Sequence, residues 1–239
     1  MKMRLYINKT MKNQNYIYLH GFASSPQGNK AVYLRQCFQD VETKLISPDL
    51  NQGDFFRLTL TRQLNLLETE YLSVSARSQL HQQPVKNISN FTGITLIGSS
   101  FGGLTAAILA QRNLQIKRLV LLAPAFQFHV HLSQLLGAEK MQQWQADGSL
   151  AFPHYGENRD LPLNYNFWLD LLQYQDEPFS RKIPTLILHG IHDDVIPIQS
   201  SREFASQRPW VELRELESDH GLGNVVAEIW QEIQGFCQI

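Results

Sequence analysis

Short runs of β-branched and aliphatic residues alternate along this chain with amphipathic segments whose apolar residues recur at helical spacing. Several of the short runs are apolar throughout, as expected for strands that are covered on both faces of a sheet. Strands and helices in alternation predict an α/β fold with a mostly parallel sheet and helices on both faces. The expected strands are residues 16–19, 44–46, 94–97, 119–122, 185–188 and 211–216, and the expected helices are residues 30–38, 55–72, 104–113, 199–206 and 224–236.

Two stretches interrupt this alternation. Residues 73–92 are polar and predict a loop or a short excursion. Residues 125–183 are too long for a plain crossover, and they are rich in phenylalanine, tyrosine and tryptophan, which argues against a disordered linker. We therefore expect residues 1–239 to form a single domain in which residues 125–183 make a small helical cap without a core of its own. The aromatic side chains of this cap either roof a substrate pocket or attach the cap to the sheet.

One junction of an expected strand and helix, ITLIGSSFGGLTAAILA at residues 94–110, carries a candidate nucleophile. It contains the pattern G-x-S-x-G, which is typical of a tight strand-to-helix turn that exposes a serine hydroxyl. The glycines lie two positions before and two after the serine because the turn brings backbones too close for side chains. Ser100 has Gly98 and Gly102 at these offsets, whereas Ser99 has no glycine at either. Ser100 is therefore the candidate nucleophile; alternatively, it caps the helix in a glycine-rich turn.

A serine nucleophile needs a base to take its proton and an acid to orient that base. In chains with this motif the order along the sequence is serine, acid, histidine. His220 fits the position of the base, because it lies in a polar loop between the last expected strand and the last expected helix. His129, His131 and His154 fall in the expected cap, where packing or surface roles are favoured.

The acid is expected in the loop after the preceding strand, where Asp193 and Asp194 are adjacent. One of them would orient the base; alternatively, both are solvated loop charges, as at least one of them is expected to be. The run His192-Asp193-Asp194 also suggests a metal site. No partner set with metal-ligand spacing occurs elsewhere in the chain, so we expect no metal.

Acyl transfer to a serine also needs two backbone N–H groups that point at the oxygen of the substrate carbonyl. Phe101, the residue after the candidate nucleophile, supplies one of them. The other is expected in the loop after the first strand, at Phe22 in the turn His20-Gly21-Phe22. His20 itself is expected to brace this loop rather than to transfer protons.

The segments YLHGFASSPQGNKA, GSSFGG, LHGIHDDVIP and SDHGL occur in this order and spacing. Together they resemble the serine esterases of the α/β-hydrolase superfamily, and most closely the small bacterial YqiA/YcfP-like esterase group. The resemblance implies an α/β-hydrolase fold with Ser100 as the nucleophile and His220 as the base. The acid is then Asp193, four residues after His189. The resemblance does not name a substrate, because this fold hydrolyses many kinds of bond.

The charge balance bears on the possible partners. Twenty-one Lys and Arg against 22 Asp and Glu give a formal net charge of −1, so there is no electrostatic reason to expect nucleic-acid binding. The longest apolar runs are too short to span a membrane. The chain has only 2 cysteines, and its N-terminal residues do not resemble a secretory signal. We therefore expect a reduced, cytoplasmic setting.

These observations predict a cytoplasmic serine esterase or thioesterase that acts on a small-molecule acyl ester or thioester without a cofactor. The aromatic-rich cap is poor in clustered Lys and Arg, which favours an apolar acyl group. The alternative is a non-enzymatic relative that binds a ligand or a partner protein. Such relatives usually lack a member of the triad, and all three candidates are present here. The sequence does not indicate an oligomeric state.

Overall fold

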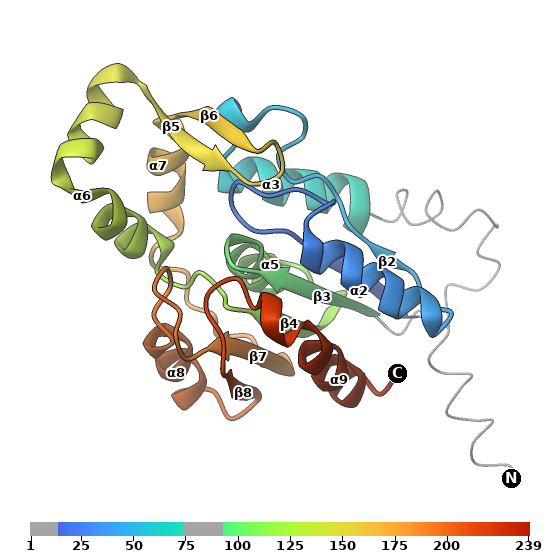
Figure 1. Cartoon of the computed structure of the whole chain (residues 1–239). Coiled ribbons are helices and arrows are strands. Elements are labelled where there is room, and N and C mark those ends of the chain that lie inside the picture. Colours follow the sequence, from blue (N-terminus) through green and yellow to red (C-terminus); the bar gives the residue numbers. More distant parts are fainter. Residues whose placement is uncertain (1–13, 74–92) are drawn as a thin grey trace, which may run out of the picture.

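The computed structural model describes residues 14–73 and 93–239 of the chain. Within these residues six strands form one sheet in the order β2-β1-β3-β4-β7-β8, and every neighbouring pair is parallel. The strands are β1 (Gln14–Leu19), β2 (Leu45–Ile46), β3 (Gly93–Ser99), β4 (Ile116–Leu122), β7 (Thr185–Gly190) and β8 (Val211–Leu216) (Figure 1). The predicted α/β class with a parallel sheet is confirmed. The loop expected at residues 73–92 lies, apart from Ser73, outside the described residues.

Helices cover both faces of the sheet. Successive side chains along a strand point to opposite faces, so each central strand contributes to an apolar cluster on either face. They are α2 (Asn29–Asp40), α3 (Leu60–Leu66), α5 (Phe101–Arg112), α8 (Gln199–Ser206) and α9 (Val226–Cys237). In β1, Tyr16 and Tyr18 belong to the apolar cluster under α2 and α9. Ile17 and Leu19 belong to the cluster under α3 and α5. Among the described residues, no helix is long and apolar enough to cross a membrane.

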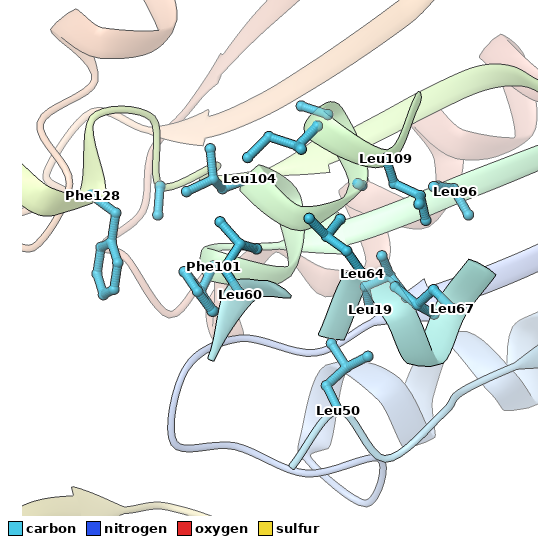
Figure 2. Packing of buried hydrophobic residues seen from close by; sticks show 14 of the residues in the cluster. Leu19, Leu50, Leu60, Leu64, Leu67, Leu96, Phe101, Leu104, Leu109 and Phe128 are labelled. Carbon is cyan, nitrogen blue, oxygen red and sulfur yellow. The ribbon is translucent and has the colours of Figure 1, made fainter. Parts of the chain in front are cut away.

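The helix expected at residues 55–72 is divided into three short segments. These are η1 (Phe55–Arg57), α3 (Leu60–Leu66) and the π-helical η2 (Leu67–Leu72). The division occurs at Thr59, whose backbone is extended (φ −144°, ψ 159°) and whose hydroxyl accepts a hydrogen bond from the N–H of Arg62. A threonine in this position caps and starts a new helix. Leu60, Leu64 and Leu67 then pack in one cluster with α5 (Figure 2).

The chain between β4 and β7 forms a group of elements over one end of the sheet (Figure 1). They are α6 (Phe128–Asp147), β5 (Ser149–His154), β6 (Arg159–Asn164), α7 (Asn166–Leu171) and η4 (Leu172–Tyr174). A kink at Gly137 (φ 75°) breaks α6. The strands β5 and β6 form an antiparallel hairpin, so the segment expected to be a helical cap also contains a small sheet. Asn158 in the turn of this hairpin has a positive φ of 51°, which asparagine tolerates better than most residues.

Aromatic side chains from this segment pack into the core that surrounds α5. Trp144, Phe152 and Phe167 are each at most 6% exposed. The Phe167 ring lies 5.5 Å from the Phe101 ring, and the Trp144 ring lies 5.2 Å from the Phe152 ring. Burial of such large rings contributes strongly to stability, and truncation of one to alanine costs about 3–5 kcal/mol. These three side chains therefore attach the segment to the sheet and do not line an open pocket.

The strand order places a crevice at one point along the edge of the sheet. The chain runs from β1 outward to β2, and then returns to β3 on the other side of β1. The loops that follow β1 and β3 therefore leave the sheet in opposite directions. In open parallel sheets, ligands bind in the crevice at the carboxyl ends of such strands.

Candidate active site

Ser100 lies on the turn between β3 and α5. Its backbone has φ 52° and ψ −118°, a conformation that non-glycine residues adopt only where the surroundings enforce it. The flanking glycines allow this turn. A Cβ at Gly98 would overlap the carbonyl of Gly102, and a Cβ at Gly102 would overlap the carbonyl of Leu19. The spacing of the glycines in the sequence thus has a direct steric cause.

The two adjacent serines differ in what they contact. The Ser100 N–H donates to the carbonyl of Leu122 (2.8 Å), and the Ser100 carbonyl accepts from the N–H of Ala125 (3.1 Å). These bonds fix the turn while the Ser100 side chain stays partly exposed. Ser99 is 3% exposed, and its hydroxyl hydrogen-bonds the phenol of Tyr18. Only Ser100 therefore has a hydroxyl that a substrate could reach.

His220 lies in the loop that follows β8. Its Nε2 is 2.9 Å from the Oγ of Ser100, and its Nδ1 is 2.7 Å from the Oδ2 of Asp193. Because an ionised carboxylate can only accept, Nδ1 carries the proton and Nε2 is the acceptor for the serine hydroxyl. The structure thus brings the three predicted side chains together in one hydrogen-bonded chain.

Asp193 is held in the loop after β7 with its side chain fully buried. Its Oδ1 accepts from the N–H groups of Val195 (3.0 Å) and Ile196 (2.8 Å), and its Oδ2 lies 3.1 Å from the Nε2 of His189. Burial alone would raise the pKa of Asp193. Hydrogen bonds from two histidine rings outweigh this effect and hold the pKa well below its usual range. The group is therefore a carboxylate at any physiological pH.

In the sequence, His189 serves only as the reference for the position of Asp193 and is given no part in the site. In the structure it is fully buried near the end of β7. Its Nε2 is 2.9 Å from the carbonyl of Ile196, and its Nδ1 is 2.7 Å from the Oγ of Ser201. A carbonyl only accepts, so Nε2 carries the proton that also faces Asp193. The spacing of four residues between His189 and Asp193 at a strand end is the signal that could have indicated this contact.

The neighbours of Asp193 point elsewhere. His192 and Asp194 are exposed, and the Nε2 of His192 is 2.5 Å from the Oε1 of Glu217. The run His192-Asp193-Asp194 therefore does not converge on one point. Across residues 14–73 and 93–239, no group of three or more His, Cys, Asp or Glu side chains is placed to hold a metal ion.

Lys30 is a second residue that sequence reasoning did not connect with the site. It is the second residue of α2, and its Nζ donates a 2.7 Å hydrogen bond to the carbonyl of Gly221, the residue after His220. Burial lowers the pKa of Lys30 to about 8, although Asp219 and Asp193 favour the charged form. A positive charge also opposes the dipole at a helix N-terminus. Lys30 therefore adopts an electrostatically unfavourable position in which it ties α2 to the loop of His220.

The two candidate oxyanion donors belong to segments that adjoin Ser100. Phe101 is the first residue of α5, where a backbone N–H has no partner inside the helix. Phe22 follows Gly21, and a Cβ at Gly21 would lie 3.4 Å from the Cβ of Ser100. The rings of Phe22 and Phe101 meet edge to face at 6.3 Å. The loop after β1 therefore packs against the turn that carries Ser100.

The histidines of residues 125–183 occupy other places. His131 on α6 has its Nε2 3.1 Å from the Oγ of Ser200, and burial lowers its pKa. His129 lies two residues before it and is partly buried. His154, at the end of β5, is 5% exposed and contacts Asn51.

A cavity of about 220 Å³ lies between α6, η4 and α8. Apolar and polar side chains both line it, among them Leu104, Phe126, Phe128, Tyr174, Phe204 and Arg208. Neither Ser100 nor His220 lines this cavity. The ring of Phe128 in its wall lies 5.1 Å from the ring of Phe101, the residue after Ser100.

A parallel sheet in this order, with a strained serine turn at its crevice, defines the α/β-hydrolase fold. Solved structures of this fold match nearly the whole chain. One is Est1E from Butyrivibrio proteoclasticus with ferulic acid bound (22% identity, 97% of this chain and 90% of that one, TM-score 0.74). Others are alpha/beta hydrolase domain-containing protein 10 from mouse (19% identity, 94% and 89%, TM-score 0.70) and a monoacylglycerol lipase from Paleococcus ferrophilus (17% identity, 93% and 93%, TM-score 0.68).

Within this fold class, the chain belongs to the family described as "Uncharacterised protein family (UPF0227)", whose model matches residues 15–237. No curated protein matches the chain in sequence. At identities of 22% and below, the solved structures establish the fold, and the reaction has to be argued from the site.

Proposed function

We propose that this protein is a serine hydrolase that cleaves carboxylic esters or thioesters through an acyl-enzyme on Ser100. The observation that carries the proposal is the hydrogen-bonded chain from Ser100 to His220 (2.9 Å) and from His220 to Asp193 (2.7 Å). Its order and geometry are those of a nucleophile, a general base and an orienting acid. The oxyanion donors are the N–H groups of Phe22 and Phe101, which flank Ser100.

The proposed reaction has two halves. The Ser100 Oγ bonds to the acyl carbon while its proton moves to the Nε2 of His220, and the oxyanion is stabilised by the two N–H groups. The carbon–oxygen or carbon–sulfur bond of the substrate then breaks, and His220 protonates the departing alkoxide or thiolate. In the second half, His220 takes a proton from water, the resulting hydroxide attacks the acyl carbon, and Ser100 regains its proton as the acid leaves.

The cavity beside Phe128 supports a proposal for the substrate class. Leu104 and Phe126 give it an apolar wall, which suits an apolar acyl group of modest size, while polar and charged side chains such as Glu203 and Arg208 line the rest. The neighbours in fold include a protein described as a metagenome-derived lipolytic enzyme and one named as a monoacylglycerol lipase. The sequence also resembles the YqiA/YcfP-like esterases. In this proposal residues 125–183 act as a cap on a single domain and close the cavity.

A covalent fluorophosphonate probe tests the proposal. The wild-type protein should become labelled, and Ser100→Ala should abolish the label without a change in circular dichroism. A folded wild-type protein that resists labelling would instead support a binding protein. Turnover of p-nitrophenyl acetate, butyrate, octanoate and palmitate, beside an acyl-CoA and a peptide amide, then defines the leaving group and chain length. An amide cleaved faster than the esters would contradict the ester assignment.

A further inference from the structure

We propose that Asn51 and His154 are positioning residues for the oxyanion donor Phe22, so that the β5–β6 hairpin braces the loop after β1. This inference rests on the proposed function, because it concerns how the N–H of Phe22 is held beside Ser100. Its physical basis is a set of contacts between three segments far apart in the sequence. These segments are residues 20–25, residues 49–53 and the end of the hairpin.

The loop after β1 needs support from outside. Ala23, the residue after the donor, has a positive φ of 52°, an uncommon conformation for alanine. Such conformations cost about 1–3 kcal/mol and persist only where neighbouring groups hold them. A loop in this state would relax if its partners were removed, and the direction of the Phe22 N–H would then change.

The side chain of Asn51 ties this loop to the hairpin. Asn51 is 7% exposed, and its Nδ2 donates to the carbonyl of Ser24 at 2.7 Å. Because a carbonyl can only accept, the amide orientation of Asn51 is settled, and the second Nδ2 hydrogen points to the Nε2 of His154 at 3.2 Å. The His154 Nε2 is therefore an acceptor, which requires the neutral ring. Burial lowers the pKa of His154 and so favours that neutral form.

The hairpin contacts the loop on both sides of this hydrogen bond. The N–H of Tyr155 donates to the carbonyl of Ala23 at 2.8 Å. The Phe152 ring meets the Phe22 ring edge to face at 5.4 Å. A Cβ at Gly156 would lie 2.9 Å from the Cβ of Ser25, so the hairpin turn is packed tightly on the loop.

Asn51 is itself held in place by a compact turn. The carboxylate of Asp49 accepts from the N–H groups of Asn51 (3.0 Å) and Gly53 (3.0 Å). The N–H of Leu50 donates to the Nε2 of His20 at 3.0 Å, and His20 immediately precedes the donor loop. The turn at residues 49–53 therefore connects to both ends of the loop, through His20 at its start and through Ser24 at its far side.

Replacement of His154 tests this role with a matched pair of variants. His154→Phe keeps an aromatic ring against Phe55 but removes the acceptor for Asn51. His154→Gln can keep an acceptor in the form of its side-chain carbonyl. With a short p-nitrophenyl ester, His154→Phe should lower kcat about 10- to 100-fold while KM changes less than about threefold, because the lost alignment acts on the developing oxyanion. His154→Gln should recover most of that loss.

Hydrogen exchange gives a second readout that does not depend on turnover. The amides of residues 20–25 should exchange faster in His154→Phe than in wild type, and His154→Gln should restore slow exchange. Asp160→Asn, at an exposed position of the same hairpin, serves as the control for both readouts. Asn51→Leu removes the same hydrogen bond from the other side and replaces His154→Phe if that variant does not fold.

The outcomes separate this inference from the proposed function. Unchanged exchange of residues 20–25 in both His154→Phe and Asn51→Leu would overturn the inference whether or not the protein is an esterase. Equal losses of kcat in the Phe and Gln variants would also overturn it, because packing alone would then explain the effect. A wild-type protein without esterase activity refutes the proposed function, while the exchange measurement still decides whether the hairpin braces the loop.

Discussion

The two sides of Ser100 are held in different ways. On the base side, Asp193 and His220 lie on loops that leave the neighbouring strands β7 and β8, and the contacts of Asp193 come from residues within four positions of it or from the next loop. On the oxyanion side, the loop of Phe22 depends on Asn51 and His154, whose side chains join residues 103 positions apart. The base side is held by loops of neighbouring strands, whereas the oxyanion side is held by the turn of Asn51 and the β5–β6 hairpin.

This difference indicates which substitutions should remove a step of the proposed reaction and which should only misalign a group that takes part in it. In the proposed mechanism His220 exchanges the proton of Ser100 directly and Asp193 holds His220 in the tautomer that can do so, so removal of either group blocks a step. Groups on the oxyanion side, apart from the two donors, only direct an N–H that stays in the chain. We therefore expect losses of several orders of magnitude on the base side and losses of one or two orders on the other.

The largest effect is expected for the nucleophile. Ser100→Ala should lower kcat/KM at least about 10⁴-fold, because no other hydroxyl on the turn can form the acyl-enzyme. The measurement is steady-state hydrolysis of p-nitrophenyl butyrate with circular dichroism as a check on folding. An active Ser100→Ala protein would remove the basis of the whole comparison.

The next effect distinguishes the two adjacent aspartates. Asp193→Asn should lower kcat about 10³-fold, because an amide cannot accept from His220 and from two backbone N–H groups in the same way and the tautomer of His220 is lost. Asp194→Asn should change kcat less than about threefold, since Asp194 is exposed. The reverse ranking on folded protein would assign the acid to Asp194.

A smaller effect is expected for Lys30, which supports the base side from a distance. Lys30→Met should lower kcat about tenfold, because the loop of His220 loses its tie at Gly221. The midpoint of thermal unfolding should stay equal or rise, since a partly buried charge at a helix N-terminus is removed. Lys44→Met, at an exposed lysine before β2, is the control. A drop in both kcat and thermal midpoint would mean that Lys30 acts mainly in packing.

The smallest effect on activity is expected for Ser99. Ser99→Ala should leave kcat/KM within about threefold but lower the free energy of unfolding by about 1–2 kcal/mol, because the buried phenol of Tyr18 loses its partner. Urea unfolding measures the second quantity. If Ser99→Ala were inactive yet fully stable, the alignment of the glycine motif with Ser100 would be wrong.

The parts of the fold that depend on local sequence could be predicted. The central strands were evident because β3 and β7 are buried along their whole length and are mostly apolar. The turn at Ser100 was evident because steric contact at Gly98 and Gly102 restricts those positions to glycine. The loops that hold Asp193 and His220 could be predicted because they come directly after the last two strands of the sheet. Steric restrictions at single positions and the order of elements along the chain can both be inferred from one sequence.

The remaining features depend on contacts that the sequence does not encode locally. Lys30 and Gly221 are 191 residues apart, and nothing near Lys30 indicates the carbonyl that it meets. His154 was expected to have a packing or surface role, yet its partner Asn51 comes from a different crossover. The β5–β6 hairpin was hidden because its strands are only partly buried and therefore lack the continuous apolar run of the central strands. Such contacts arise from tertiary packing, which overrides local preference.

The position of His220 late in the chain also has a consequence during protein synthesis. The Ser100 turn and its partner His220 are separated by 120 residues. At about 5–20 residues per second, a ribosome needs roughly 6 to 24 s to add that length. In the proposed mechanism Ser100 has no base to activate it during that interval. Hydrolysis by this mechanism therefore requires that translation has passed β8 and reached His220.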